Sequence, residues 1–93
     1  MTAPGLPIKY TDAHWTVRKA ARERYVELQG GICCHCGAPL SGPSDEDRNV
    51  NENALPSGFF RYPVHLHHDH HTDYTIGAVH AHCNAVLWEH YGE

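Results

Sequence analysis

The segment "HLHHDHHTDYTIGAVHAHCN" (residues 65–84) carries seven of the ten histidines in a chain of 93 residues. This density exceeds that of an ordinary surface or core segment, and histidine-rich tracts are typical of metal binding. A chain of this length is interpreted as a single domain, residues 1–93, with a small hydrophobic core. Such domains commonly need a metal ion or disulfides to fold stably. The segment therefore predicts that a metal contributes to the fold.

Cysteine usage points the same way, with four cysteines at positions 33, 34, 36 and 83. The first fifteen residues contain no basic region followed by an apolar run, and no segment reaches transmembrane length. We therefore expect a cytoplasmic protein with no secretory signal and no membrane partner. In a reducing compartment, a pair spaced like Cys33 and Cys36 is typical of metal or redox sites. Disulfides between cysteines this close are strained, so we favour zinc over disulfides.

Two short motifs with the same spacing predict the zinc ligands. Cys33-x-x-Cys36 follows a pair of glycines, and His80-x-x-Cys83 repeats the spacing about 44 residues later. Three thiolates and one imidazole form a common closed, tetrahedral structural site for Zn²⁺. His82 competes with His80 but leaves only one residue before Cys83, which is tighter than the usual knuckle. The two residues inside the first motif, Cys34 and His35, are interpreted as bystanders.

The N-terminal third predicts an irregular arm over residues 1–10 and then a helix. Thr11 or Asp12 is a suitable N-cap, and the glycines at 30 and 31 end the helix after about Gln29. Apolar residues recur at helical spacing on the face expected to be buried, and these are Val17, Ala21, Tyr25 and Leu28. The opposite side carries three cations that we predict to contact phosphates: Arg18, Lys19 and Arg22.

The remaining segments predict a loop, a hairpin and a terminal helix. Residues 41–58 are polar, acidic and rich in Pro, Gly and Asn, which predicts a solvated loop without a function. β-type residues resume in "FFRYPVHLHH" (59–68), and "YTIGAV" (74–79) gives a second strand after a turn at 69–73. A helix from Ala81 or His82 should bury Val86 and Leu87, with Trp88 at its edge. The predicted fold class is small α+β.

Charge alone argues mildly against a nucleic-acid partner. The net charge is −4; residues 1–42 hold five Lys/Arg and three Asp/Glu, and residues 43–93 hold two and eight. Proteins that bind DNA usually present a basic patch, and the basic residues gather only between Arg18 and Arg24. Bound divalent cations would offset part of the acidic half.

The segment "HHDHHTDYTIGAVHAHCN" (67–84) resembles the HNH nucleases, and most closely the recombination endonuclease VII branch. That branch has the pattern Asp-His-Asp-His-x-Thr-Gly, followed by Arg-Gly-Leu-Leu-Cys-x-x-Cys-Asn, and residues 67–84 align with it without a gap. With "ELQGGICCHCG" (27–37), the resemblance covers about half of the chain. It implies a ββα-metal fold, in which a hairpin and a helix hold one catalytic divalent ion beside a structural zinc.

The resemblance also implies roles for single residues. His68 corresponds to the general base, His67 to the first metal ligand, and Asn84 to a second ligand on the helix; His70 corresponds to a residue that helps to hold substrate or water. Colicin-type nucleases likewise open with paired histidines. This chain departs from the branch pattern at four positions, where His67 replaces Asp, Asp73 replaces Gly, Ile76 replaces Arg and His80 replaces Cys; Thr75 lies near the middle Asn of the HNH motif.

Independent chemistry favours the same residues. A neutral imidazole titrates near working pH and suits a base that deprotonates water. Adjacent helical residues lie about 100° apart, so Cys83 can face zinc while Asn84 faces a second ion. Taken singly, each residue also has a structural interpretation: Asn84 as an N-terminal helix residue, His70 as a solvated side chain, and other histidines as exposed or hairpin-packing side chains (His65, His71, His82 and His90).

The resulting functional prediction is a metal-dependent DNA endonuclease that hydrolyses phosphodiester bonds to leave 5′-phosphate and 3′-hydroxyl ends. Its expected cofactors are a structural Zn²⁺ and one catalytic divalent ion, Mg²⁺, Mn²⁺, Co²⁺ or Ni²⁺. DNA is the expected partner, together with phage packaging or recombination proteins. Two alternatives remain open: a non-catalytic zinc-knuckle module that binds nucleic acid or protein, and a zinc or nickel storage peptide.

Overall fold

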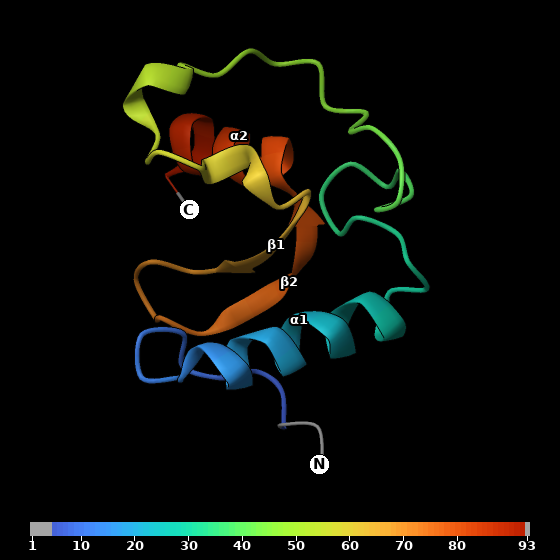
Figure 1. Ribbon diagram of the computed structural model, residues 1–93, viewed down its shortest axis with the longest axis vertical. Coiled ribbons are helices and arrows are strands. Elements are labelled where there is room, and N and C mark those ends of the chain that lie inside the picture. The colour runs from blue at the N-terminus through green and yellow to red at the C-terminus, as the bar shows by residue number, and fades with distance from the viewer. Residues whose placement is uncertain (1–4, 93) are drawn as a thin grey trace.

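The computed structural model describes residues 5–92 and has two helices that cover the two faces of a β-hairpin (Figure 1). Helix α1 (Trp15–Leu28) and helix α2 (Ala81–Tyr91) each pack against both strands, β1 (Val64–His68) and β2 (Thr75–His80). Two short 3₁₀ turns, η1 (Glu52–Ala54) and η2 (Phe59–Arg61), precede the hairpin. The predicted α+β class is confirmed. Residues 1–4 of the predicted arm lie outside the described residues.

Helix α1 begins later than predicted. His14 is the N-cap, and its Nδ1 accepts a hydrogen bond from the Thr16 amide at 3.3 Å. Thr11 is used elsewhere, because its amide and hydroxyl both donate to Asp73 Oδ2, at 3.1 and 2.5 Å. The helix ends as predicted, where Gly30 (φ 65°) and Gly31 (φ 75°) adopt the left-handed conformation that glycine favours.

The face that α1 buries differs from the prediction. Val17 and Leu28 are 37% and 60% exposed, and Ala21 is the buried residue. Tyr25 and Val26 pack against the core, and hydrogen bonds add to these contacts: the Tyr25 hydroxyl lies 2.9 Å from Thr75 Oγ1, and the Gln29 amide hydrogen-bonds to β2. A periodicity count of apolar residues misses such a face because hydrogen-bonding side chains form part of it.

The Gln29 side chain completes the free edge of β2. Its Oε1 accepts from the Ala78 amide at 2.9 Å, and its Nε2 donates to the Ala78 carbonyl, also at 2.9 Å. The same Nε2 donates to Ile32 O at 2.7 Å. One amide therefore satisfies backbone groups that a third strand would otherwise pair, and it ties the end of α1 to the sheet.

The strands pair antiparallel, from Val64 opposite His80 to His68 opposite Thr75. An irregularity between His67 and His68 leaves Ile76 as an extra residue on β2. The turn at 69–73 is confirmed, and Asp69 Oδ1 closes it by accepting from two amides, His71 N at 2.7 Å and Thr72 N at 3.2 Å. The strand predicted to resume at residue 59 starts only at 64, because residues 59–61 form the turn η2.

Part of the arm is attached to β2. Lys9 forms an isolated antiparallel bridge with Tyr74, the Tyr10 amide donates to Asp73 O at 2.8 Å, and the Thr75 amide donates to Ile8 O at 3.0 Å. The described part of the arm, residues 5–10, forms no helix or strand beyond this single bridge, in line with the prediction. These contacts nevertheless hold Tyr10 beside the first residues of β2.

The hydrophobic core is small and surrounds the junction of β2 and α2. Its buried cluster consists of Cys33, Leu40, Ala78, Val79, Cys83 and Leu87. The largest fully buried side chains of the described residues are Val79, Val86 and Cys83, so no aromatic ring is among them. In α2, Val86 and Leu87 are buried and Trp88 is 45% exposed, as predicted. Domains with a core of this size commonly depend on a metal ion or disulfides for stability.

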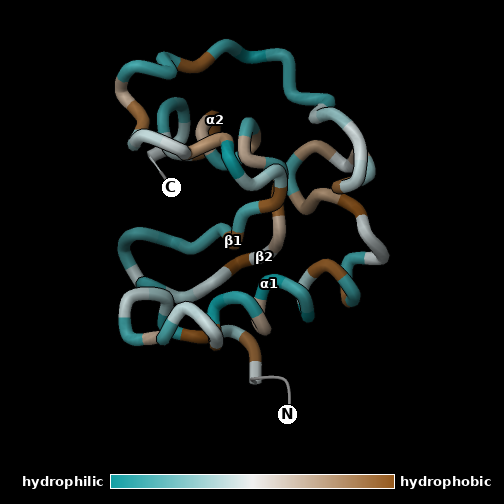
Figure 2. The backbone as a smooth tube through the Cα atoms, in the orientation of Figure 1, coloured by the Kyte–Doolittle hydropathy of each residue, from teal (hydrophilic) through white to brown (hydrophobic). Residues whose placement is uncertain are grey.

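The segment 41–58 is largely exposed and hydrophilic (Figure 2). It is not only a solvated loop, however, because it is attached along α2. The Asn51 amide donates to Glu89 Oε2 at 3.0 Å, and His90 Nε2 lies 3.1 Å from Asn49 O. No helix within residues 5–92 is both long and apolar enough to cross a membrane.

Candidate functional site

The four predicted zinc ligands come together between the knuckle and the start of α2. The donor atoms of Cys33, Cys36, His80 and Cys83 all lie within 4.8 Å of one another. The first two lie in a turn closed by a bridge between Ile32 and Pro39, in which Gly37 has a φ of 79°. The other two lie at the end of β2 and in the first turn of α2. Three of the four side chains are buried, so the cluster is part of the core.

The spacing of these atoms fits a tetrahedral ion. His80 Nδ1 lies 3.4 Å from Cys36 Sγ and 3.7 Å from Cys83 Sγ. Bonds of about 2.3 Å to sulfur and about 2.0 Å to nitrogen, at the tetrahedral angle, place the two ligand atoms about 3.5 Å apart. These two distances and the donor set of three thiols and one imidazole therefore fit Zn²⁺.

His80 is oriented for metal binding through Nδ1. Its Nε2 lies 2.9 Å from the Pro39 carbonyl, which only accepts, so the proton is on Nε2 and the Nδ1 lone pair faces the thiols. Histidine ligands are commonly held in this way by a second hydrogen bond. The predicted choice of His80 over His82 agrees with this geometry, because His82 is not in the cluster.

The thiols differ in how readily they lose a proton. Burial raises the pKa of Cys36, but hydrogen bonds from the amides of Asp45 and Ala38 and from the neighbouring thiols outweigh it and lower this pKa to about 6. Burial raises the pKa of Cys83 to about 12, although Ser44 opposes the shift. Ser44 Oγ lies 3.0 Å from Cys83 Sγ. Its hydroxyl can donate to the thiolate that a metal requires, so the segment 41–58 contributes to the cluster.

The two predicted bystanders lie outside the cluster. Cys34 is exposed. The ring of His35 points to the segment 41–58, where its Nε2 lies 2.9 Å from Glu46 Oε2. The hydrogen bond from His35 is the main cause of a lowered pKa at Glu46. This hydrogen bond holds the segment near Ser44.

A second group of polar side chains surrounds Asn84, the residue that follows Cys83 of the zinc cluster. His67 Nδ1 is 3.1 Å from Asn84 Oδ1, and His65 Nδ1 is 3.1 Å from Asn84 Nδ2. His67 therefore donates to the amide oxygen, and His65 accepts from the amide nitrogen. The structure thus brings together the two residues predicted to hold a catalytic ion, and Cys83 and Asn84 point to different groups as expected. His65, predicted to be exposed or packed in the hairpin, joins them.

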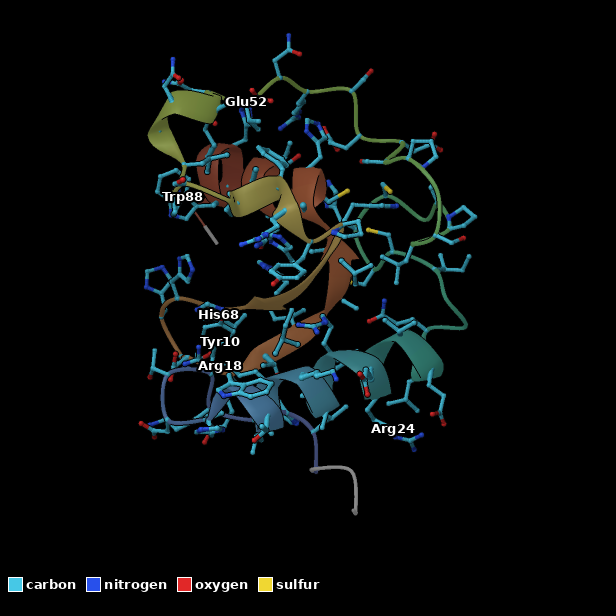
Figure 3. The ribbon with its side chains drawn as sticks, viewed as in Figure 1. Tyr10, Arg18, Arg24, Glu52, His68 and Trp88 are labelled. Carbon is cyan, nitrogen blue, oxygen red and sulfur yellow. The ribbon has the colours of Figure 1, made fainter. Side chains whose placement is uncertain are left out.

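His68 lies on the other side of β1, against the arm. Its ring stacks on Tyr10, with centroids 3.9 Å apart and an angle of 6° between the planes. The Arg18 guanidinium lies 4.0 Å from the centre of the same Tyr10 ring, and its Nε donates to Tyr10 O at 2.8 Å. The ring of His70 is 4.7 Å from that of His68. Figure 3 shows Tyr10, Arg18 and His68 gathered where α1 approaches the hairpin.

The pKa of His68 is lowered. Burial is the main cause, and the positive charges of His70, His67 and Arg18 act in the same direction, while Asp73 opposes them. The imidazole is therefore neutral at neutral pH and has a lone pair available for a proton.

A groove of about 900 Å³ runs past both Asn84 and His68. His65, His68, His70 and Asn84 line it, together with all three cations that the sequence predicted to contact phosphates: Arg18, Lys19 and Arg22. Within residues 5–92, no Asp or Glu lines the groove, although the chain has a net charge of −4. Acidic residues do lie beside the groove, since Lys19 pairs with Glu23 at 3.9 Å and Asp73 acts on His68, but none is part of its lining.

Sequence reasoning missed three participants: Tyr10, His65 and Ser44. His65 precedes His67 by two residues, and the two-residue period of a strand places both on one face, so this signal was present. Tyr10 and Ser44 reach the site through contacts with residues far away in the sequence, and no local pattern marks them.

Comparison of the chain with protein-family models, with curated protein sequences and with solved structures gave no match. Function is therefore inferred from the chemistry of the chain's own residues. In residues 5–92, the Cys₃His cluster is the one group of three or more His, Cys, Asp or Glu residues that could hold a metal.

Proposed function

We propose that this chain is a metal-dependent DNA endonuclease of the HNH class, in which β1, β2 and α2 form the ββα-metal unit. The observation that carries the proposal is the 3.1 Å approach of the buried His67 to Asn84, which itself lines a groove shared with His68 and Arg18. Phosphodiester hydrolysis needs ligands for a metal ion, a neutral base and cations that contact the phosphate. The products would carry 5′-phosphate and 3′-hydroxyl ends.

Backbone conformation supports the resemblance at two positions where the endonuclease VII branch has glycine. Asp73 has a φ of 67°, a conformation that favours glycine and is uncommon for other residues. Gly77 is crowded: a Cβ added there would lie 2.8 Å from Cys34 Sγ and 2.8 Å from Gln29 Oε1. The branch pattern thus has glycine where this backbone accommodates one best.

His67 and Asn84 would hold the catalytic ion. Octahedral bonds of about 2.1 Å place neighbouring ligand atoms about 3.0 Å apart, close to the 3.1 Å between His67 Nδ1 and Asn84 Oδ1. The ion would stabilise charge on the phosphate and on the departing 3′ oxygen. Two protein ligands leave room for both oxygens, and the His67 ligand atom must then be without its proton.

The chain's own groups would carry out the remaining steps. His68, neutral because of its lowered pKa, accepts a proton from the attacking water. Stacking on Tyr10 fixes the plane of its ring. His70, on the turn beside it, is placed to contact substrate or water, while Lys19 and Arg22 attract the phosphates.

The second candidate is a non-catalytic zinc module that binds nucleic acid or protein. It is favoured by the position of the Cys₃His cluster within the core, where a bound metal would have a structural role that requires no reaction. In that case His68 would be an incidental residue of the hairpin.

Cleavage of supercoiled plasmid separates the two candidates. Zinc-loaded protein should nick the plasmid when a divalent ion is added, and His68→Ala should reduce the rate by roughly 10²- to 10⁴-fold, the usual contribution of a positioned acid or base. His71→Ala is the matched control, because His71 is exposed on the same turn and does not line the groove. A His68→Ala protein that retains zinc and nicks as fast as the parent contradicts the nuclease proposal.

A further inference from the structure

Aromatic rings line the same groove on both sides. They are Tyr10, Trp15, Phe59, Tyr62 and Trp88. Trp15 is 65% exposed and Tyr62 is 66% exposed. Large apolar side chains exposed together commonly mark a binding surface. Both tryptophans of the chain are in this set.

The rings stand on opposite walls. Trp15 projects from α1, which also carries Lys19 and Arg22, and Trp88 projects from α2. Figure 3 shows Trp88 on the α2 side, and Tyr10, Arg18 and His68 on the α1 side. Apolar residues also line the groove: Leu55, Pro56, Val64 and Leu66.

The combination of cations and aromatic rings in one groove indicates which kind of ligand it binds. The cations and the absence of lining carboxylates within residues 5–92 require a negatively charged partner. The rings require flat, apolar faces to stack on. In duplex DNA the faces of the bases are already stacked on each other, and only their edges reach the grooves. A single strand offers phosphates and free base faces together, and aromatic rings in a basic groove are the usual means of binding it.

We propose that the groove binds single-stranded DNA, with bases stacked on Trp15 and Trp88 and phosphates contacted by Lys19 and Arg22. The inference rests on the proposed function in one respect, since it names the form of DNA that would reach His68. The substrate would then be an unpaired segment of DNA, and regular duplex would bind more weakly because it cannot use the rings.

Binding can be measured without cleavage by using zinc-loaded His68→Ala protein with no other divalent ion. The probes are a fluorescent oligo(dT) and a duplex of matched phosphate number, followed by anisotropy, and unlabelled oligo(dT), followed by tryptophan fluorescence. Oligo(dT) should bind more tightly than the duplex and quench the tryptophans. Affinity should fall with salt, with a slope of about −0.7 for each phosphate contacted.

Single substitutions test each wall. Trp88→Ala or Trp15→Ala should weaken oligo(dT) binding by about 5- to 150-fold, the equivalent of about 1–3 kcal/mol for a stacked base. Trp88→Phe should retain most of the affinity. Tyr91→Ala is the matched control, because Tyr91 is an exposed aromatic residue of α2 that does not line the groove. Arg22→Gln should reduce the salt slope.

The possible failures are distinguishable. Duplex binding equal to or tighter than oligo(dT), or unchanged affinity in folded Trp88→Ala and Trp15→Ala proteins, overturns the single-strand proposal while plasmid cleavage can persist. Salt-independent binding of oligo(dT) overturns it as well, since an apolar or peptide-binding groove would behave in this way. Selective oligo(dT) binding by a protein that cleaves no DNA supports the inference and counts against the nuclease.

Discussion

His67 and Asn84 are 17 residues apart in the sequence, yet His67 Nδ1 lies 3.1 Å from Asn84 Oδ1. The hairpin produces this approach, because β2 returns the chain antiparallel to β1 and α2 begins directly at its end. Cys83 precedes Asn84 and belongs to the zinc cluster. The first turn of α2 therefore carries both a ligand of the candidate zinc site and Asn84, the partner of His67. Loss of zinc should for this reason also displace Asn84 from His67.

Removal of zinc should unfold the protein. The largest fully buried side chains of the described residues are two valines and one of the cluster's cysteines, and binding of structural zinc contributes on the order of 10 kcal/mol of apparent free energy. Circular dichroism and metal analysis during chelation should show loss of structure together with loss of zinc, and recovery when Zn²⁺ but not Mg²⁺ is returned.

Neighbouring cysteines supply a control for this experiment. Cys36→Ser removes a cluster ligand and should abolish stoichiometric zinc binding, whereas Cys34→Ser leaves the four ligands in place and should retain it. Native circular dichroism in fully zinc-free protein would contradict the structural assignment.

Gly77→Ala should destabilise the fold by about 1–3 kcal/mol, the usual effect of overpacking. The new Cβ would lie 2.8 Å from Gln29 Oε1 and 2.8 Å from Cys34 Sγ. The Gln29 amide cannot move away without losing its hydrogen bonds to Ala78. Urea unfolding of zinc-loaded protein measures the difference.

The control is Gly42→Ala, where an added Cβ would meet only Pro39 O at 3.8 Å. Gln29→Ala removes one of the two colliding side chains, so the double variant Gln29→Ala, Gly77→Ala should be more stable than the sum of the single effects predicts. Strict additivity would show that Gly77 is not limited by Gln29.

The parts of the fold that the sequence predicted depend on local spacing. The zinc ligands form two short motifs, the turn at 69–73 is closed by its own Asp69, and the start of α2 follows directly from β2. The errors concern packing between distant segments. The buried face of α1 is set by hydrogen bonds from Tyr25 and Gln29 to β2, which apolar periodicity does not reveal.

The same distinction applies to the candidate site. His67, His68 and Asn84 follow from one continuous segment, whereas the stacking of Tyr10 on His68 depends on how the arm attaches to β2. No residue near Tyr10 in the sequence indicates that contact. The exposed rings of Trp15 and Trp88 likewise become one surface only after both helices pack on the hairpin.

The metal preference of the proposed nuclease should depend on His67. Imidazole suits Mn²⁺, Co²⁺, Ni²⁺ and Zn²⁺ better than the hard Mg²⁺ ion, which prefers carboxylate. His67→Asp should therefore raise the nicking rate with Mg²⁺ relative to the rate with Mn²⁺ or Ni²⁺. The comparison uses one zinc-loaded preparation across a series of metals, with His71→Asp as a control for added charge in the hairpin. An unchanged order of rates in His67→Asp would remove His67 from the coordination of the ion.

The pH dependence of cleavage should follow the lowered pKa of His68. A general base works only when neutral, so the rate should fall as pH drops through this pKa. Burial and the charge of His70 place the pKa below the ordinary histidine value of about 6.5, and a bound cation acts in the same direction. Activity should therefore persist into mildly acidic buffer and be lost below it. His70→Ala removes a positive neighbour and should move this acidic limb to higher pH, whereas His71→Ala should leave it in place. Initial nicking rates across pH, with zinc content checked at each point, measure this fall in rate. If the fall stays at the same pH in His70→Ala, or persists in His68→Ala, the titrating group is a residue other than His68.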